Sequence, residues 1–371
     1  MRTIRAAASA AAFLLCTFAA NAGVLVPIPP VPGSTSMGAA GINDLNQIAG
    51  TFGTSDNLYH GFVGDLNGNY VTFDASAGGT SVHALNNNGY VTGGAFDNPD
   101  DFVGKAFVRK PNGAIKLITK DGSAFDGYGD GITNKAVFVG SIYQFADSRI
   151  SDLLYELGYY GKGHAYQADL VLPFNTYQTR PRGINRYGEV IGYYTDVDHA
   201  VNGSYPTSGF VLKNGVATRV VYPDPNAFYV FLNGLNDKGK IVGAWLHVDQ
   251  TPQHAFVYDF ERNRFKLIDV PGETRVTASG INNSGVVTVS AGGKAYIYCP
   301  KKKTCPIQSP SAIEVPERWI SAAGYPRTVP CKNGCKGPFH PSRTQLDPAA
   351  VREAITRDPE IQRELRLPFR P

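Results

Sequence analysis

Residues 234–243 read Gly-Leu-Asn-Asp-Lys-Gly-Lys-Ile-Val-Gly, and five variants of this pattern occur elsewhere in the chain. The copies are aligned on an Ile or Leu that recurs every 43 to 52 residues, at Ile42, Leu85, Ile132, Ile184, Leu235 and Ile281. A repeat of this period indicates an array of similar supersecondary units. The repeat is therefore the starting point for assigning the fold.

Two positions in each copy call for special backbone geometry. Four residues after the Ile or Leu stands a residue suited to positive φ, as in a tight hairpin turn: Asn46, Gly89, Gly188, Gly239 or Gly285. Ala136 is the exception in the third copy. Eight residues after the Ile or Leu stands a second Gly, replaced by Val289 in the last copy. The apolar pairs between these positions, such as Ile241-Val242, indicate a buried strand.

Each copy continues with a small residue and an aromatic one, and then with a further turn and a short apolar run. The small–aromatic pairs are Gly61-Phe62, Ala106-Phe107, Ala165-Tyr166, Gly209-Phe210, Ala255-Phe256 and Ala295-Tyr296. Four strands per copy are typical of one blade of a β-propeller. We therefore predict an all-β, six-bladed propeller over residues 23–308. Two β-sandwich domains are the alternative, but they would not explain six copies in phase.

Composition agrees with this fold class. The 371 residues include 41 Gly and 25 Pro, too many for a helix bundle, while 43% are hydrophobic, too many for a low-complexity chain. Residues 24–33 match the end of a blade without the rest of one. We expect them to supply the fourth strand of the last blade and so close the ring.

The triplet His254-Ala255-Phe256, its variants His60-Gly61-Phe62 and His164-Ala165-Tyr166, and the preceding Gly-Ile-Asn pattern resemble the HAF family of bacterial extracellular repeats. The resemblance covers about residues 24–300. It implies a secreted propeller and brings no catalytic residues with it. We do not expect the triplet histidines to form a metal site, because other copies have Lys or Ser there.

The ends of the chain differ from the repeat region. Residues 1–22 have two arginines, an apolar stretch and an Ala-Asn-Ala site, which is typical of a secretory signal peptide. No later segment is long and apolar enough to span a membrane, so we expect a secreted monomer, periplasmic or extracellular, without a transmembrane anchor. Export favours disulfides, and we expect the pairs Cys299–Cys305 and Cys331–Cys335. A four-thiolate zinc site is the alternative, but the spacings suit it poorly.

Residues 309–371 form a Pro-rich basic tail. Residues 301–371 hold 13 Lys or Arg against 7 Asp or Glu. Pro-rich stretches predict an extended chain along the propeller wall, and Asp347-Pro348 and Asp358-Pro359 predict the starts of two short helices. The only basic run is Lys301-Lys302-Lys303, and it lacks the interleaved aromatics of a nucleic-acid site. We expect no nucleic-acid partner.

Function is expected where the copies differ, in the long connections of one face. Long loops on a rigid scaffold commonly carry binding groups. Aromatic rings can stack on sugars while polar groups bind hydroxyls, so the expected ligand is an extracellular glycan or a cell-surface protein. The expected binding residues are Tyr143, Arg149, Tyr159, Tyr160, Tyr193, Tyr194, Tyr205, Trp245 and Asp249. A packing role for Tyr194 and Trp245, and a turn-forming role for Asp198 and Asp249, are the structural alternatives.

Two function classes follow from these residues. The first is a non-catalytic binding or scaffold propeller. The second is a polysaccharide hydrolase or lyase that uses Asp147, Asp152, Asp198, His199 or His247 in acid/base roles. No cofactor is expected; a calcium loop at Asp126–Gly131 is a minor alternative, because Tyr128 replaces one of its ligands.

Overall fold

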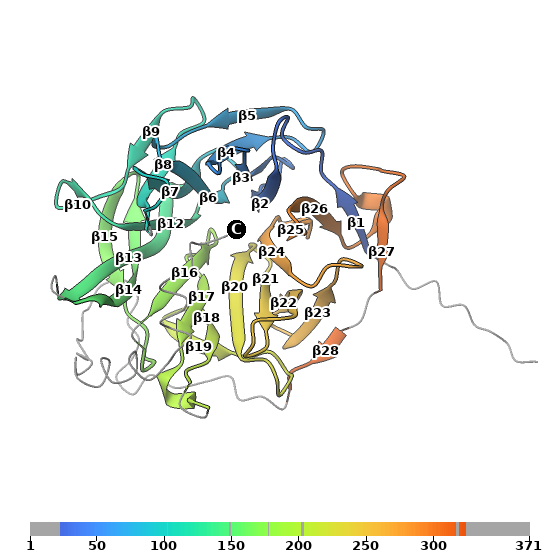
Figure 1. Cartoon of the computed structure of the whole chain (residues 1–371). Coiled ribbons are helices and arrows are strands. Elements are labelled where there is room, and N and C mark those ends of the chain that lie inside the picture. Colours follow the sequence, from blue (N-terminus) through green and yellow to red (C-terminus); the bar gives the residue numbers. More distant parts are fainter. Residues whose placement is uncertain are drawn as a thin grey trace, which may run out of the picture.

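The computed structural model describes residues 23–323 except 102, 148, 149, 177, 202, 203, 317 and 318, and it omits the side chains of residues 144–155. Its strands form a ring of sheets around a central axis (Figure 1). Apart from two single-turn 3-10 helices, η1 (Val197–His199) and η2 (Lys302–Thr304), its regular elements are all strands. The protein is therefore an all-β propeller.

In the described residues the antiparallel ladders group into six four-stranded units, here called blades. Blade 1 contains β2 (Ser36–Ile42), β3 (Ile48–Gly53), β4 (Tyr59–Gly64) and β5 (Tyr70–Phe73). Blade 2 contains β6 (Gly79–Leu85), β7 (Val91–Phe96), β8 (Lys105–Arg109) and β9 (Ile115–Leu117). Blade 3 contains β12 (Gly127–Ile132), β13 (Val137–Asp147), β14 (Ile150–Lys162) and β15 (Ala165–Leu170).

The other three blades follow the same order. Blade 4 contains β16 (Thr179–Ile184), β17 (Val190–Thr195), β18 (Thr207–Lys213) and β19 (Val216–Val220). Blade 5 contains β20 (Tyr229–Leu235), β21 (Lys240–Leu246), β22 (Gln253–Asp259) and β23 (Arg264–Ile268). Blade 6 contains β24 (Val276–Ile281), β25 (Val287–Ala291), β26 (Lys294–Cys299) and β1 (Gly23–Pro27). Two short strands, β10 (Thr119–Lys120) and β11 (Ser123–Ala124), extend the edge of blade 3.

The first strand of each blade lies nearest the axis, and neighbouring first strands approach closely (Figure 1). The Gly of the Gly-[Ile/Leu]-Asn triplet stands at this approach. A Cβ on Gly280 would lie 2.9 Å from Cα of Gly41, and one on Gly131 would lie 2.8 Å from Cα of Gly183. Backbone atoms cannot move aside as a flexible side chain can, so these positions exclude larger residues.

The triplet Asn binds its neighbour in the ring. Asn86 Nδ2 donates to the Thr133 carbonyl (2.8 Å) and Asn236 Nδ2 donates to the Asn282 carbonyl (2.9 Å). Asn282 Nδ2 reaches the Asn43 carbonyl (3.2 Å), which joins blade 6 to blade 1. The same side chains accept backbone N–H groups within their own turns, as Asn236 Oδ1 does from Lys240. One residue type thus shapes the turn and links the blades.

The second-strand Gly is also required by close packing. A Cβ on Gly243 would lie 1.9 Å from the Phe231 carbonyl oxygen on β20 and 3.0 Å from the Phe256 ring on β22. In blade 6 the register shift between β24 and β25 spans Ala278 to Ile281, and Val289 occupies this position. Val289 pairs with Ala278 on β24 and with Tyr296 on β26, in the same register as Gly243 in blade 5.

Blade 3 corrects one part of the expected repeat. The aromatic residue opposite its second-strand Gly140 is Tyr159, on β14, whereas Ala165-Tyr166 lies on the fourth strand, β15. The segment from Ser141 to His164 is largely the β13–β14 hairpin rather than a long loop, and its ladder extends to the pair Asp147 and Ile150. His164-Ala165-Tyr166 resembles the third-strand triplet by composition but follows a tight turn at Gly163.

The ends of the described chain meet at blade 6. β1 pairs antiparallel with β26 on one side and with β27 (Ile313–Val315) on the other. Cys299, at the end of β26, is disulfide-bonded to Cys305. β28 (Trp319–Ser321) then pairs with β23 at the outer edge of blade 5. The expected signal peptide, the Cys331–Cys335 pair and the two tail helices lie outside the described residues.

The hydrophobic core lies between the blades. Phe62, Phe107, Phe210 and Phe256, each on a third strand, are fully buried in separate clusters. In blades 1 to 5 a buried aromatic ring lies opposite the second-strand Gly, so burial of these rings is a major apolar contribution to the stability of the ring of blades.

The turn position with positive φ gives a stability prediction. Ala136 has φ of 54°, and its counterpart Gly239 has φ of 67°, where an added Cβ would meet no atom within 4 Å. We expect Ala136→Gly to raise the free energy of unfolding by about 1 kcal/mol, and Gly239→Ala to lower it by a similar amount, because an L side chain is strained there. Urea denaturation measures both changes.

Ala165→Gly is the control, since Ala165 lies in a strand with ordinary φ. It is expected to lose stability through backbone entropy. A stability gain in Ala165→Gly equal to that in Ala136→Gly would contradict the assignment of strain to residue 136.

Candidate functional site

The side chains closest to the axis come from two rows of first-strand residues, two and four positions before the repeat Ile or Leu. Alternate residues of a strand share one face, and in β2 these positions are part-exposed while their neighbours are buried. The row two residues before is Ala40, His83, Asp130, Arg182, Asn233 and Ser279. The row four residues before is Gly38, Ser81, Tyr128, Arg180, Phe231 and Thr277. Charged and aromatic residues therefore concentrate on blades 2 to 5.

His83, Asp130 and Arg182 link the first strands of three consecutive blades. Nδ1 of His83 lies 2.8 Å from Oδ1 of Asp130, and Nη1 of Arg182 donates to the same oxygen. The Asp130 side chain is fully buried, whereas that of Arg182 retains 19% exposure. The remaining ring nitrogen of His83 lies 3.0 Å from the Ser81 hydroxyl. A buried carboxylate thus holds a histidine and an arginine beside the axis.

A second ion pair involves Arg180, from the row four residues before the repeat Ile or Leu. Arg180 Nε is 3.2 Å from Oε1 of Glu156, and both side chains are buried. Oε2 of Glu156 accepts a hydrogen bond from Nε2 of Gln178 (2.8 Å). The Arg180 guanidinium also lies over the Tyr128 ring, 5.0 Å from its centroid. We call His83, Asp130, Arg182, Arg180 and Glu156 the axial cluster.

Burial and nearby charges determine the protonation states of Asp130 and His83. Burial alone would raise the pKa of Asp130, but the charge of Arg182 and the hydrogen bond from His83 lower it to about 2. Burial lowers the pKa of His83 to about 4, and Asp130 offsets only part of this effect. At neutral pH the cluster therefore contains a carboxylate and a neutral imidazole. Neither group has a pKa suited to proton transfer near pH 7.

Aromatic side chains stand next to the axial cluster. The rings of Tyr193 and Phe231 make an edge-to-face contact at 4.7 Å, and Phe231 and Tyr229 are near parallel at 6.3 Å. Tyr143 contacts Tyr128 edge-to-face at 5.8 Å. Tyr193, Tyr229, Phe231 and Tyr143 are all part-exposed. We call these four residues the aromatic wall.

Two of the expected binding residues, Tyr143 and Tyr193, belong to the aromatic wall. Three others are packing residues, which corrects the expectation. Tyr159 is fully buried and donates to the Tyr128 carbonyl (3.0 Å). Tyr194 stacks on Phe174 at 4.5 Å and Trp245 stacks on Tyr222 at 4.6 Å, both buried. Tyr194 and Trp245 lie on second strands, and each stacks on a ring from the connection that leads into its own blade.

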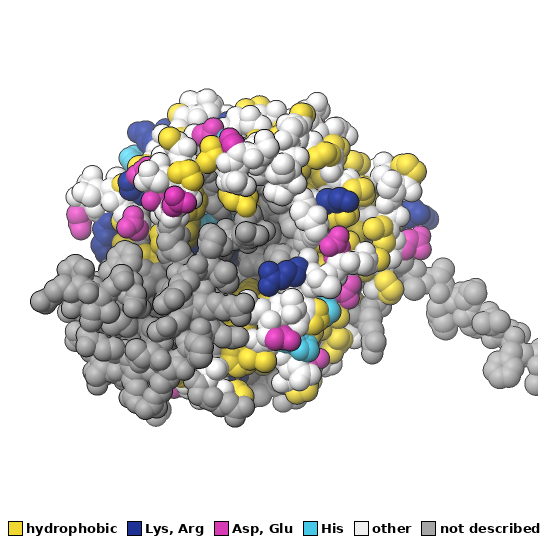
Figure 2. Space-filling model, viewed as in Figure 1, with side chains coloured by type: hydrophobic (Ala, Val, Ile, Leu, Met, Phe, Trp, Pro, Cys, Tyr) yellow, Lys and Arg dark blue, Asp and Glu magenta, His cyan; other side chains and the backbone are white. Residues whose placement is uncertain are grey.

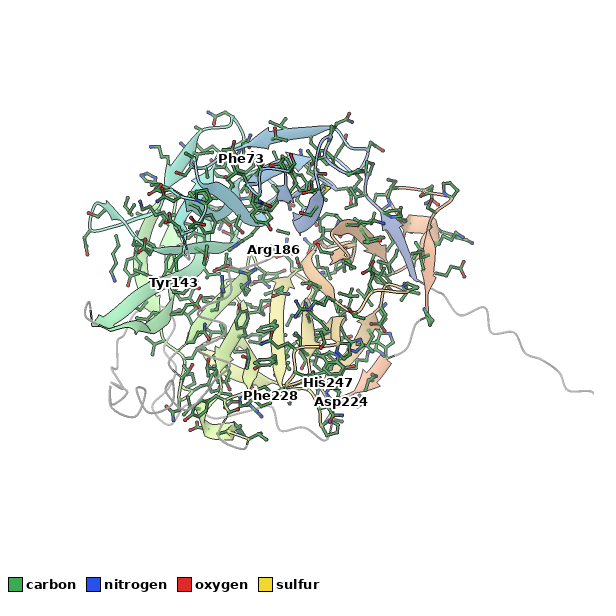
Figure 3. All side chains as sticks on the ribbon, viewed as in Figure 1. Phe73, Tyr143, Arg186, Asp224, Phe228 and His247 are labelled. Carbon is green, nitrogen blue, oxygen red and sulfur yellow. A yellow bond between two sulfur atoms is a disulfide. The ribbon has the colours of Figure 1, made fainter. Side chains whose placement is uncertain are left out.

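The remaining expected residues are dispersed. Tyr160 and Tyr205 are part-buried, and burial raises the pKa of Tyr160 to about 12. Asp249 accepts the Thr251 backbone N–H (3.2 Å), as a turn-forming aspartate does. His247 stacks on Trp245 and lies near the periphery of blade 5, on a different side of the axis from Tyr143 (Figure 3).

The expected acids do not converge with the histidines in the described residues. Asp198 is exposed and accepts from Asn175 Nδ2 (3.1 Å). Next to it, Nδ1 of the half-exposed His199 lies 2.7 Å from Asp196, which is buried. Arg149 and the side chains of Asp147 and Asp152 lie outside the described part.

Metal binding finds no support in the described residues. The calcium-loop alternative does not fit, because Gly127–Ile132 is strand β12 and Asp130 is engaged by Arg182 and His83. His60 and His254 instead pair with Asp74 (2.7 Å) and Asp269 (3.1 Å). In the described part of the chain, no three His, Cys, Asp or Glu side chains gather as metal ligands would.

Most of the axial cluster and part of the aromatic wall lie outside the residues predicted from the sequence. The predicted residues depart from the repeat in the long connections, whereas Asp130, Arg182 and Phe231 depart from it within the first strands. A comparison of the copies two and four residues before the Ile or Leu would have found them. Small residues occupy these positions in blade 1, as Gly38 and Ala40.

On the surface, charges of both signs are interspersed. Figure 2 shows Lys or Arg next to Asp or Glu over the described part of the viewed face, with no continuous basic patch. None of the helices in the described part of the chain could cross a lipid bilayer.

No protein-family model and no curated protein matches the sequence. Among solved structures, a streptogramin B lyase is similar at 12% identity and a TM-score of 0.40, over 75% of this chain and 97% of that chain. A gluconolactonase from Xanthomonas campestris is similar at 12% identity and a TM-score of 0.46, over 75% and 89%. The β-propeller domain of the Trilobed protease from Pyrococcus furiosus is similar at 9% and 0.42, over 71% and 94%. These likenesses carry no inference about a shared site or activity, and the propeller is evident from its own ladders.

His83 gives a pH prediction. Its neutral form is buried in the folded protein, whereas the unfolded chain takes up a proton below pH of about 6.5. The unfolded state therefore binds more protons between pH of about 6.5 and the folded pKa of about 4. We expect the free energy of unfolding to fall as the pH is lowered through this window.

The measurement is urea denaturation of the wild type and of His83→Gln at several pH values from 7 to 4. The variant is expected to lose less stability over this range than the wild type. Parallel pH profiles for the two proteins would contradict a buried, neutral His83.

Proposed function

We propose that this protein is an exported, non-catalytic binding propeller that recognises an extracellular glycan at the aromatic wall and axial cluster. The observation that carries the proposal is the asymmetry of the axis. Aromatic and hydrogen-bonding side chains gather on blades 3 to 5, while Gly38 and Ala40 of blade 1 leave that side small. Repeat packing alone does not require such a difference between equivalent positions.

The chemistry of the wall suits sugars. Tyr193, Tyr229 and Phe231 offer part-exposed rings that can stack on the apolar face of a pyranose. Gln178 and Arg182 are part-exposed next to them and can donate to hydroxyl oxygens. Both are already oriented by carboxylates, Gln178 by Glu156 and Arg182 by Asp130. Pre-oriented donors beside aromatic rings favour binding because little side-chain entropy is lost.

The non-catalytic part of the proposal is supported by the electrostatics. The pKa of Asp130 is lowered, so this buried carboxyl is not held as a proton donor near neutrality. Asp198 is exposed and lies on η1, apart from the first-strand rows. A hydrolase would need an acid and a base facing one reacting bond.

The enzyme alternative retains one supporting observation. Asp196 accepts from His199 Nδ1 (2.7 Å), Ser208 Oγ (2.7 Å) and Arg219 Nε (2.6 Å). A carboxylate held in this way fixes the histidine tautomer and leaves Nε2 for proton transfer. Product release from a bound polysaccharide that is abolished in His199→Ala would establish this alternative.

Export is part of the proposal. The Cys299–Cys305 disulfide agrees with an oxidising compartment, where such bonds persist. We also propose that the protein is a member of the HAF family and that residues 1–22 are removed on export. Mass spectrometry of the protein recovered from the producing cell would test the cleavage before Gly23.

A glycan-binding screen tests the site. Phe231→Ala and Tyr193→Ala are each expected to weaken binding at least about tenfold, because each removes a stacking ring. Gly38→Trp is expected to block binding by filling the small side of the axis. A Cβ at Gly38 meets only ordinary contacts, with Ser290 Oγ at 3.5 Å the nearest, so the backbone at this position does not exclude a side chain.

Tyr187→Ala is the matched control. Tyr187 is 62% exposed and belongs to a turn between first and second strands, at the other end of the axis from the long connections. The affinity of this variant is expected to equal that of the wild type. Equal affinity for Phe231→Ala, Tyr193→Ala and Tyr187→Ala would place any glycan elsewhere, and the lack of any bound glycan would favour a protein partner.

A further inference from the structure

The ionised side chains of the axial cluster cancel in charge. Asp130 and Glu156 are negative, Arg180 and Arg182 are positive, and the low pKa of His83 keeps its imidazole neutral at pH 7. The other members of the two first-strand rows, such as Asn233, Thr277 and Ser279, carry no charge. At the start of the first strands, one exposed acid, Asp126, is matched by one exposed base, Arg275. The described walls of the site are therefore electrically balanced.

Arg182 still has hydrogen-bonding capacity. Its Nη1 binds Asp130, but its Nε is buried without a hydrogen-bond partner, and 19% of the side chain is exposed. An arginine fork has five N–H donors in a fixed plane. Asp130 engages one edge of this fork, so another edge can donate to a ligand oxygen without a change in the protein.

From this balance we infer that the axial site selects uncharged glycans over acidic ones, with Arg182 donating to a sugar oxygen and Asp130 and Glu156 determining the charge preference. The inference rests on the proposed function and adds the class of glycan. It assigns to the two buried carboxylates a role beyond linking the blades.

The physical reason is the state of the two arginines. A ligand carboxylate would lose hydration on entering the site, and it would need an unpaired cation to compensate. Arg180 is already paired with Glu156, and Arg182 with Asp130. A third anion would face two buried carboxylates across a region of low dielectric constant. A neutral hydroxyl avoids this repulsion and still accepts a hydrogen bond from Arg182.

The experiment compares two ligands that differ only in charge, such as galactose and galacturonic acid oligosaccharides of equal linkage and length. Isothermal titration calorimetry gives both dissociation constants. The wild type is expected to bind the neutral form at least about tenfold more tightly. Asp130→Asn and Glu156→Gln each remove one negative charge with little change of shape, and each is expected to shift the ratio at least about tenfold toward the acidic form.

A second variant avoids disturbing the buried network. Ala40 is part-exposed in the row two residues before the repeat Ile, on the side without charges. Ala40→Lys adds a cation there, with every member of the axial cluster intact. It is expected to shift the ratio in the same direction even if Asp130→Asn fails to fold.

Asp100→Asn is the control for net charge, because Asp100 is exposed in the connection between β7 and β8. Its ratio is expected to match the wild type. Tighter binding of the acidic form by the wild type would overturn the inference but not the proposed function. The same holds if the ratio of the two dissociation constants is unchanged in Glu156→Gln and Ala40→Lys. Failure of both ligand forms, and of every other glycan in the screen, would overturn the proposed function and the inference with it.

Discussion

The close approach of the first strands is the constraint on which the ring depends. Where Gly280 meets Gly41 and Gly131 meets Gly183, a Cβ on the first residue would lie within 3.0 Å of a backbone atom. A larger residue would push neighbouring blades apart near the axis. Because each blade packs on two others, a displacement at one contact would be transmitted around the ring. Across the first of these contacts, Asn282 Nδ2 donates to the Asn43 carbonyl (3.2 Å).

Much of the fold could be predicted from the sequence because each blade repeats the same local requirements. Positive φ at Asn46, Gly89 and Ala136 follows from the turn alone, and the structure has it at all three. The phase of blade 3 could not be predicted in the same way. The triplet that begins at His164 has the sequence pattern of a third strand. The third strand is instead the one whose aromatic residue, Tyr159, lies opposite Gly140.

The candidate site was less predictable than the fold. Aromatic residues in segments of unequal length predict Tyr143 and Tyr193 correctly as part-exposed, but they equally predict Tyr159 and Trp245, which are core residues. The sequence alone could not distinguish the exposed residues from the buried ones, since exposure depends on the face of the strand and on the neighbouring blade. Asp130 and Arg182 lie 52 residues apart and meet only because adjacent first strands lie side by side.

The position of β1 between β26 and β27 bears on the order of folding. Its register joins Val24 to Cys299 and Gly23 to Val315, so the earliest described residues pair with some of the last. The entropic cost of closing so long a loop grows only logarithmically with its length, but contacts of such sequence separation form slowly. Five blades can assemble from local hairpins while β1 has no partner. Closure of the ring therefore belongs to the end of synthesis, and a chain that stops before β26 would retain an open sheet edge.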